Sequence, residues 1–174
     1  DWLAAHKTQA PHRVFLKLNS GMNRLGFTPT AFRAAWARLN ALPQVDEISL
    51  MTHFSDADGP RGVAQQLATF EAASHDLPGE RSLSNSAAVL RHAADLRVKA
   101  DWVRPGIVLY GSAPDFPEHS ASHWDLQPTM TLASKLIAVQ DLPVGGTVGY
   151  GSLFTADQPL RIGILGRHGA RQAA

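Results

Sequence analysis

A regular alternation of strand-like and helix-like segments over residues 14–111 is the feature that most constrains the fold. Four short apolar runs are typical of strands, at 14–19, 46–54, 81–84 and 101–111. Three stretches between them repeat apolar residues at helical spacing: one capped by Thr28 or Thr30 and closed by Pro43, one at 63–73 and one at 85–96. This alternation favours a parallel sheet with helical crossovers.

Four strands with three intervening helices make about half of an eight-stranded β/α barrel, which typically needs ~250 residues. The character of the chain changes after residue 111. A stretch rich in Pro, Ser and His predicts a linker, and strand-like runs separated by Pro-Gly turns then predict the start of an all-β domain. We therefore predict an α/β fold class, a partial TIM-type barrel followed by the beginning of an all-β domain. The expected parts are 1–113, a linker at 114–128, the β part at 129–164 and a divergent tail at 165–174.

Composition excludes several classes of partner. The net charge is +1, so no nucleic-acid partner is indicated, and no apolar run approaches the ~20 residues needed to span a bilayer. There is no cysteine, which excludes disulfides and thiolate metal sites. His53, Asp56 and Asp58 are close in sequence, but no second cluster with metal-ligand spacing accompanies them, so no metal site is predicted. The first residues, from Asp1, are typical of the end of a helix, so we expect part of a longer protein.

Polar residues recur at the carboxyl ends of the four expected strands. Carboxyl ends of parallel strands gather on one face of a β/α array, which is where such folds bind their ligands. The recurrence therefore predicts a site on that face. Its candidate residues, in strand order, are Lys17 and Arg24, then His53, then Asn85 and Ser86, and finally Arg104, Gly106 and Ile107.

Each of these residues also has an ordinary structural explanation. Lys17 lies in an apolar strand, on the face opposite Leu16 and Leu18, and can extend its amine into solvent. Arg24 can be a solvated loop residue, and His53 a hydrogen-bonded core residue. Asn85 and Ser86 are good helix caps, and Gly106 can serve only the turn after Pro105. A serine hydroxyl with two free amides after the last two strands would also suit a phosphate monoester such as that of pyridoxal 5'-phosphate (PLP).

Several runs resemble the alanine racemase family, in the same order and spacing. Four of them resemble the second half of its barrel domain: LKLNSGMNRLGF (16–27), MTHFSDAD (51–58), SNSAAVL (84–90) and DWVRPGIVLYGSAP (101–114). The run at 128–154 resembles the opening of its C-terminal β-domain. The resemblance implies a cytoplasmic, homodimeric PLP enzyme of fold type III. It would interconvert L- and D-alanine, for the cell wall or for catabolism.

The resemblance also implies roles for individual residues. Arg104 matches the arginine that hydrogen-bonds the pyridine nitrogen of PLP, and Arg24 matches the one near the phenolic oxygen and the substrate carboxylate. Lys17 matches a lysine that many members carry as a carbamate, which would hold Arg24 by a charge-assisted hydrogen bond. The cofactor's surroundings match in four further places: His53 beside the ring, the Asn85-Ser86 pair, and a phosphate cradle formed by Ser86, Gly106 and Ile107.

Neither catalytic base of the family has a matching position here, so we predict no catalytic residue in this chain. The Schiff-base lysine belongs to a family segment that nothing here matches, and Lys7, Lys17, Lys99 and Lys135 stand in other contexts. The catalytic tyrosine belongs to a run expected after the segment 161–164, where the resemblance stops. We expect a frameshift or premature stop near Leu165, which the other reading frames of the DNA would test.

Three functions remain open from the sequence. The first is a truncated alanine racemase, inactive by itself. The second is a broad-specificity amino-acid racemase of the same fold, because the substrate pocket depends partly on segments that this chain does not match. The third is a non-catalytic PLP-binding or interaction remnant.

Overall fold

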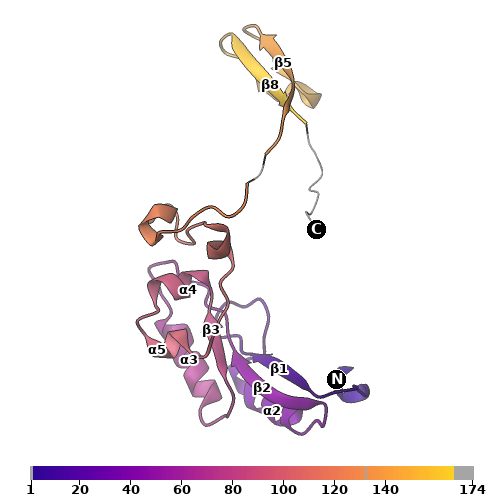
Figure 1. The fold of residues 1–174 in the computed structure, drawn as a ribbon, viewed down its shortest axis with the longest axis vertical. Coiled ribbons are helices and arrows are strands. Elements are labelled where there is room, and N and C mark those ends of the chain that lie inside the picture. Colours follow the sequence, from indigo (N-terminus) through magenta and orange to yellow (C-terminus); the bar gives the residue numbers. More distant parts are fainter. Residues whose placement is uncertain (1, 132, 167–174) are drawn as a thin grey trace. The chain divides into compact units, whose positions relative to one another are not determined.

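The structure is a computed structural model that describes residues 2–131 and 133–166. The chain divides into two compact units, Asp1–Met130 and Thr131–Ala174 (Figure 1). Within the described residues, no helix is both long and apolar enough to cross a membrane.

The first unit contains a parallel four-stranded sheet, which confirms the predicted α/β class. The strands lie side by side in chain order, from one edge to the other (Figure 1). Their bounds are β1 His12–Lys17, β2 Val45–Met51, β3 Arg81–Ser84 and β4 Trp102–Val103. This order without a switch point is that of consecutive barrel strands.

Helices follow the first three strands, and their ends have local causes. Thr28 caps α2 because its hydroxyl accepts a hydrogen bond from the Ala31 amide, as the sequence predicts. The helix expected at 85–96 is instead two short helices, because α4 ends before His92 and Asp95 caps a new one. The bounds are α1 Trp2–Ala5, α2 Pro29–Asn40, α3 Ala64–Ser74, α4 Ser86–Arg91 and α5 Leu96–Lys99.

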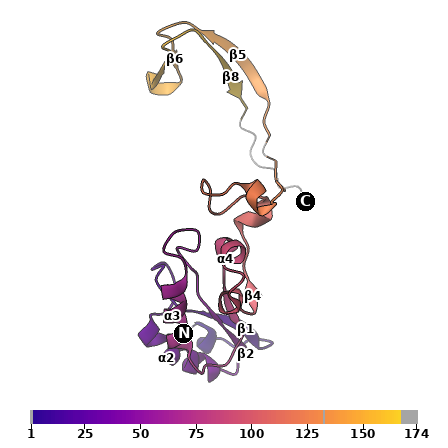
Figure 2. The same cartoon turned by 90° about the vertical axis from the view of Figure 1, so that its left-hand side faces the viewer.

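The core lies between the sheet and these helices. Leu16 and Leu18 are almost fully buried while Phe15 is 49% exposed, so the predicted alternation of the first strand is confirmed. Phe32 of α2 and Phe70 of α3 are fully buried against the same face. Lys17 therefore lies on the face that the helices do not cover. Figure 2 gives a second view of the helices and strands of this unit.

The strand expected at 101–111 is much shorter in the structure. Only Trp102–Val103 form β4, and Ile107–Tyr110 form a 3-10 helix, η1. Proline has no amide hydrogen to donate to a sheet ladder, so Pro105 ends the pairing. This early end sets Arg104 and Gly106 at the edge of the sheet rather than inside it.

Part of the stretch expected as a linker folds against the first unit. Asp115 is buried, and its carboxylate accepts hydrogen bonds from His119 and Trp124. Ala121–Trp124 form a second 3-10 helix, η2. These contacts make residues 115–124 an ordered segment and not an extended tether.

The second unit is made of antiparallel strands, as expected for a β part. β5 Leu136–Leu142 pairs with β8 Leu160–Leu165, and β6 Thr147–Val148 pairs with β7 Phe154–Thr155. A 3-10 helix, η3 Tyr150–Ser152, joins β6 to β7. Of the expected divergent tail at 165–174, residues 167–174 lie outside the described residues.

Candidate functional site

Side chains from three consecutive strand ends surround one cavity at the carboxyl edge of the sheet. The cavity has a volume of about 340 Å³. Its walls combine the loop after β2, the start of α4 and the turn after β4. Six residues predicted from the sequence line it: His53, Asn85, Ser86, Arg104, Gly106 and Ile107. The other lining residues are Met22, Phe54, Ser55, Asp58, Ala87 and Pro114.

Arg104 is the most firmly held cation of this site. Its Nη1 donates to Ser82 Oγ at 2.7 Å, and its Nη2 donates to the Thr52 carbonyl oxygen at 2.7 Å. Burial lowers its pKa from the ordinary value for arginine, but a guanidinium remains protonated at neutral pH. The acceptors that the structure gives Arg104 are all neutral, so its positive charge is not cancelled by a carboxylate partner.

His53 stands beside Arg104 and is neutral. Burial lowers its pKa most, and the nearby charges of Arg104, Lys17 and Arg24 lower it further. Its Nδ1 lies 3.5 Å from Nη2 of Arg104. Arginine can only donate, and the other ring nitrogen, Nε2, lies 3.5 Å from the donor Nδ2 of Asn85, so each ring nitrogen faces a donor and these contacts do not single out one tautomer. His53 is therefore a neutral, partly buried ring at the cavity wall.

Asn85 both caps α4 and holds the loop that carries His53. Its Oδ1 accepts from the Ala88 amide at 3.0 Å, so the capping interpretation is confirmed. Its Nδ2 donates to the Phe54 carbonyl oxygen at 3.0 Å. The side chain thus ties the end of β2 to the end of β3.

Ser86 and Gly106 meet directly at the cavity. The Gly106 amide donates to Ser86 Oγ at 2.8 Å, which leaves the hydrogen of that hydroxyl as a donor. A Cβ at Gly106 would lie 3.8 Å from Ser86 Oγ and would occupy space beside the hydroxyl. A glycine here keeps room for a ligand atom at this end of the cavity.

Lys17 and Arg24 do not line this cavity. Lys17 ends β1, and Arg24 lies in the exposed loop that follows. Burial lowers the pKa of Lys17, and the charges of Arg24 and Arg104 lower it further. The two residues are therefore electrostatic neighbours of the cavity, without being part of its wall in this chain.

The loop that carries Arg24 is closed by backbone pairing at its base. Phe27 donates to the Lys17 carbonyl oxygen at 2.8 Å, and Asn19 donates to that of Phe27 at 2.9 Å. A Cβ at Gly26, whose φ is +124°, would lie within 2.9 Å of this backbone, so only glycine fits. Asn19 Oδ1 also accepts from the amides of Gly21 and Asn23.

Sequence reasoning missed the residues that position the cations. Ser82 and Thr52 hold Arg104, and buried Gln66 of α3 contacts both the amide and the hydroxyl of Ser55 in the His53 loop. A serine in a buried strand and a threonine directly before His53 were the available signals. Gln66 gave no such signal, because its partners are distant in sequence.

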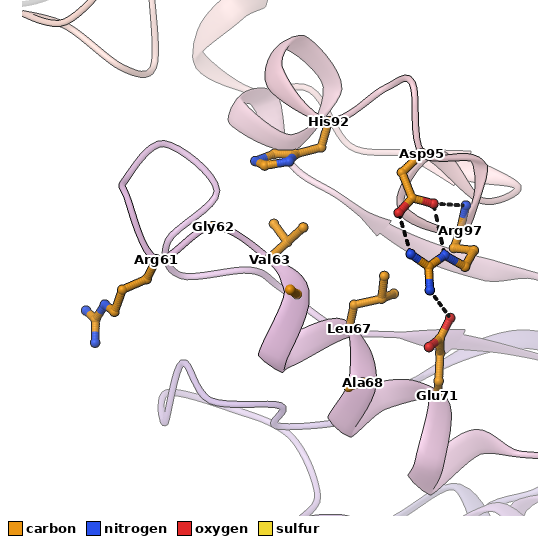
Figure 3. A pocket seen from close by; sticks show the side chains of 10 residues that line it. Arg61, Gly62, Val63, Leu67, Ala68, Glu71, His92, Asp95 and Arg97 are labelled. Carbon is orange, nitrogen blue, oxygen red and sulfur yellow. Dashed lines mark hydrogen bonds and ion pairs between the residues drawn. The ribbon is translucent and has the colours of Figure 1, made fainter.

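A second cavity of about 390 Å³ lies between α3 and the α4–α5 region (Figure 3). Arg97 is one of the residues that line this second cavity, and its guanidinium pairs with Asp95 and Glu71. It shares no lining residue with the site at the strand ends. Across residues 2–131 and 133–166, no group of three metal-ligating side chains occurs.

The site at the strand ends suits a small planar anion. Arg104 supplies an uncancelled positive charge, His53 a neutral ring, and the Ser86 region a hydroxyl donor beside a glycine. An anion gains from such donors in a partly buried cavity because few water molecules compete for them. Among the side chains that line the cavity, His53 and Asp58 are of types that can accept a proton.

Known proteins with similar sequence cover almost all of this chain. An alanine racemase from Polaromonas sp. (strain JS666) is 76% identical over 165 residues, which are 95% of this chain and 45% of the relative. An alanine racemase from Acidovorax sp. (strain JS42) is 74% identical over the same shares. The chain thus spans less than half the length of these relatives.

Solved structures of alanine racemases are also similar to this chain. The biosynthetic alanine racemase from Pseudomonas aeruginosa superposes with a TM-score of 0.76 and 45% identity, over 91% of this chain and 44% of that one. The alanine racemase from Bartonella henselae, solved with covalently bound pyridoxal phosphate, shares the fold with a TM-score of 0.65 at 19% identity, over 88% of this chain and 42% of that one. The sequence model of "Alanine racemase, N-terminal domain" matches residues 1–114. With its parallel strands, the family model and these relatives in agreement, the chain belongs to the alanine racemase family.

Proposed function

We propose that this chain is the part of a PLP-dependent alanine racemase that holds the cofactor ring and phosphate. One observation carries the proposal. Six side chains or amides from three successive strand ends surround a single cavity, and its half-buried arginine has only neutral partners. PLP has an acceptor at its ring nitrogen and an anion at its phosphate, so both needs have a candidate partner here.

The residues present fit the cofactor. Arg104 would donate to the ring nitrogen, and His53 would pack beside the ring. The Ser86 hydroxyl and the Ile107 amide would hold the phosphate, next to Gly106, whose own amide donates to Ser86 Oγ. PLP, when bound, supplies the electron sink that stabilises the charge left after a proton leaves the α-carbon of an amino acid. Arg104 cannot pass its proton to the ring nitrogen, so it would keep that sink moderate and favour return of the proton.

Lys17 and Arg24 would act on the side of the cofactor's phenolic oxygen. We propose that Lys17 is carboxylated, because its lowered pKa favours the neutral amine that attacks CO₂. The new N–C bond releases one proton and leaves a carbamate anion. That anion would hold the Arg24 guanidinium beside the cofactor and the substrate carboxylate.

Binding is the direct test of this function. Titration with PLP, followed by its absorbance, is expected to show saturable binding that pyridoxal, which lacks the phosphate, matches only weakly. Arg104→Gln should weaken PLP binding at least tenfold. Arg97→Gln is the matched control, because Arg97 is an arginine outside the cavity and should leave binding unchanged. Equal affinity for PLP and pyridoxal, or an Arg104→Gln variant that binds normally, would contradict the proposal.

Racemisation is expected to need more of the protein than this chain. We propose that the chain alone turns over no L-alanine, because none of its residues matches either catalytic base of the family. An assay coupled to D-amino-acid oxidase should show no D-alanine above a control with PLP alone. Measurable turnover would show that a residue of this chain serves as a base, and assays with other L-amino acids would then define its specificity.

We also propose the division of the chain, its assembly and its location. The barrel part is proposed to span 1–113, a connection 114–128 and the β part 129–164. The intact protein is proposed to be a cytoplasmic homodimer, in keeping with the resemblance to the family. Light scattering on the full-length protein tests the assembly, and a monomer at micromolar concentration would contradict it.

A further inference from the structure

The loop after β2 has its backbone pinned by side chains from one neighbouring segment. Asn85 donates to the Phe54 carbonyl oxygen at 3.0 Å, and Arg91 donates to that of Asp58 at 2.8 Å. His92 Nε2 lies 3.0 Å from the carbonyl oxygen of Ala57. The donors span 85–92, which is α4 and its two flanking residues. The loop has no regular structure of its own, so its shape depends on this segment and on Gln66 of α3, which contacts Ser55.

Arg91 also joins that loop to the segment after β4. Its Nη1 lies 2.9 Å from Glu118 and 3.5 Å from the Asp115 carboxylate. The Asp115 side chain has no exposed surface, whereas that of Glu118 is 56% exposed. A carboxylate out of contact with water is costly unless charged or polar partners surround it.

Asp115 has such partners from its own segment. Its Oδ2 lies 2.7 Å from His119 Nδ1, and its Oδ1 accepts from Trp124 Nε1 at 3.0 Å. With Arg91, these contacts fix the path of the chain directly after Pro114. A buried carboxylate with three different donors fixes the relative positions of all three.

Both ends of this network reach the candidate cavity. Asp58, whose carbonyl Arg91 holds, lines it, and so does Pro114, which precedes Asp115. Ser86 and Ala87, at the start of the same helix α4, line it as well. We propose that Asp115 and Arg91 are positioning residues of this cavity: together they hold the Asp58 loop and Pro114 against α4 and so set the space available to the phosphate of the ligand.

This inference rests on the proposed function only for the identity of the ligand. Its structural half is that two wall segments are held by one charge pair, in which the Asp115 carboxylate is buried. The ligand half is that their position matters more for a phosphate monoester than for the same ring without phosphate. The two halves have separate measurements.

Asp115→Asn is the first variant to test. Asparagine can still accept from Trp124, but it cannot balance the charge of Arg91 or accept through both original oxygens. Hydrogen exchange is expected to increase in 53–62 and 112–124 while exchange in the core strands is unchanged. Affinity for PLP and for inorganic phosphate should fall at least fivefold, and affinity for pyridoxal should change less than twofold. A merely structural role would weaken all three ligands alike.

Two further variants complete the design. Glu118→Gln removes the exposed partner of Arg91 and is the matched control, expected to change exchange and binding less than twofold. Arg91→Lys keeps the charge but cannot reach several acceptors at once, and it should reproduce the Asp115→Asn pattern in weaker form. If Asp115→Asn does not fold, Arg91→Lys tests the positioning role in its place.

The outcomes separate the inference from the proposed function. If the unmodified chain binds PLP and the variants match it in binding and in exchange, the inference is wrong and the function stands. If the unmodified chain binds neither PLP nor phosphate, the proposed function is wrong. In that case faster exchange confined to the two wall segments still supports the structural half, and unchanged exchange overturns it.

Discussion

The two units of this chain use apolar residues in opposite ways. In the first unit Leu50, Phe70 and Leu83 are completely buried. In the second unit Leu153 is 95% exposed and Ile137 67%, and Ala156 is the only buried apolar residue among those the structure describes there. A sheet buries an apolar face only when another layer covers it. Helices cover the sheet of the first unit, and nothing in the described part of the second unit covers its two pairs of strands.

The largest expected difference between the two units comes from a leucine-to-alanine substitution made in each of them. Leu50→Ala removes a fully buried side chain and should lower the free energy of unfolding by about 2–5 kcal/mol. Leu153→Ala makes the same change at an exposed position and should alter it by no more than about 0.5 kcal/mol. Urea unfolding followed by circular dichroism measures both. Equal losses would mean that the second unit has a core of its own.

One glycine in each unit tests whether the atoms packed around it determine the cost of adding a Cβ. Gly26→Ala places a Cβ against the backbone of the Arg24 loop and should cost about 1–3 kcal/mol. Gly145 also has a positive φ, of +79°, but its added Cβ would meet nothing within 4 Å. Gly145→Ala should therefore cost only the backbone term of about 1 kcal/mol. Thermal unfolding of both variants measures these costs. If Gly145→Ala loses as much stability as Gly26→Ala, packing around the added Cβ does not determine them.

Acid should weaken the first unit through Asp115. Burial alone raises the pKa of this carboxyl, but the hydrogen bonds from Trp124 and His119 outweigh it and leave the pKa below the ordinary value of 3.8. The stabilisation is therefore complete above about pH 3.8 and is lost as the pH falls through the lower folded-state pKa. Asp115→Asn should cost about 1–3 kcal/mol at pH 7.

All four tryptophans lie in the first unit, so their fluorescence reports its unfolding alone. As the pH is lowered, the urea midpoint measured by this signal should decrease in the unmodified chain. It should decrease less in Asp115→Asn. An identical pH dependence in both proteins would show that Asp115 does not contribute to it.

Ion pairs on the two surfaces should give the smallest effects. Arg13 pairs with Glu47 at 2.6 Å and lies 5.9 Å from the Trp102 ring centroid, so Arg13→Ala should cost about 0.2–1 kcal/mol. Arg161 pairs with Asp141 in a strongly exposed pair of strands, and Arg161→Ala should cause no measurable change. Raising the salt concentration should remove most of the Arg13 effect. A larger loss for Arg161→Ala would reverse the comparison.

The sequence predicts those residues of the site that lie at the carboxyl ends of the strands. His53 and Arg104 lie within expected strand runs, and Asn85 and Ser86 follow another. Their convergence follows from the parallel topology. Arg24 shows the limit of this reasoning, because a loop residue's place is set by loop geometry and not by strand order. Asp115 lay in a stretch whose Pro, Ser and His content predicted only a linker.

The sequence by itself determined the order of strands and helices, a threonine cap at Thr28 or Thr30, and the buried face of β1. These depend on local spacing and on side chains close in sequence. Only the tertiary structure decided that Arg104 has neutral partners, that α4 ends at Arg91, and that Asp115 is buried beside it. Ser82 and Thr52 lie 22 and 52 residues from Arg104 in the sequence, and Arg91 lies 24 residues from Asp115. The periodicity of a sequence does not encode such contacts.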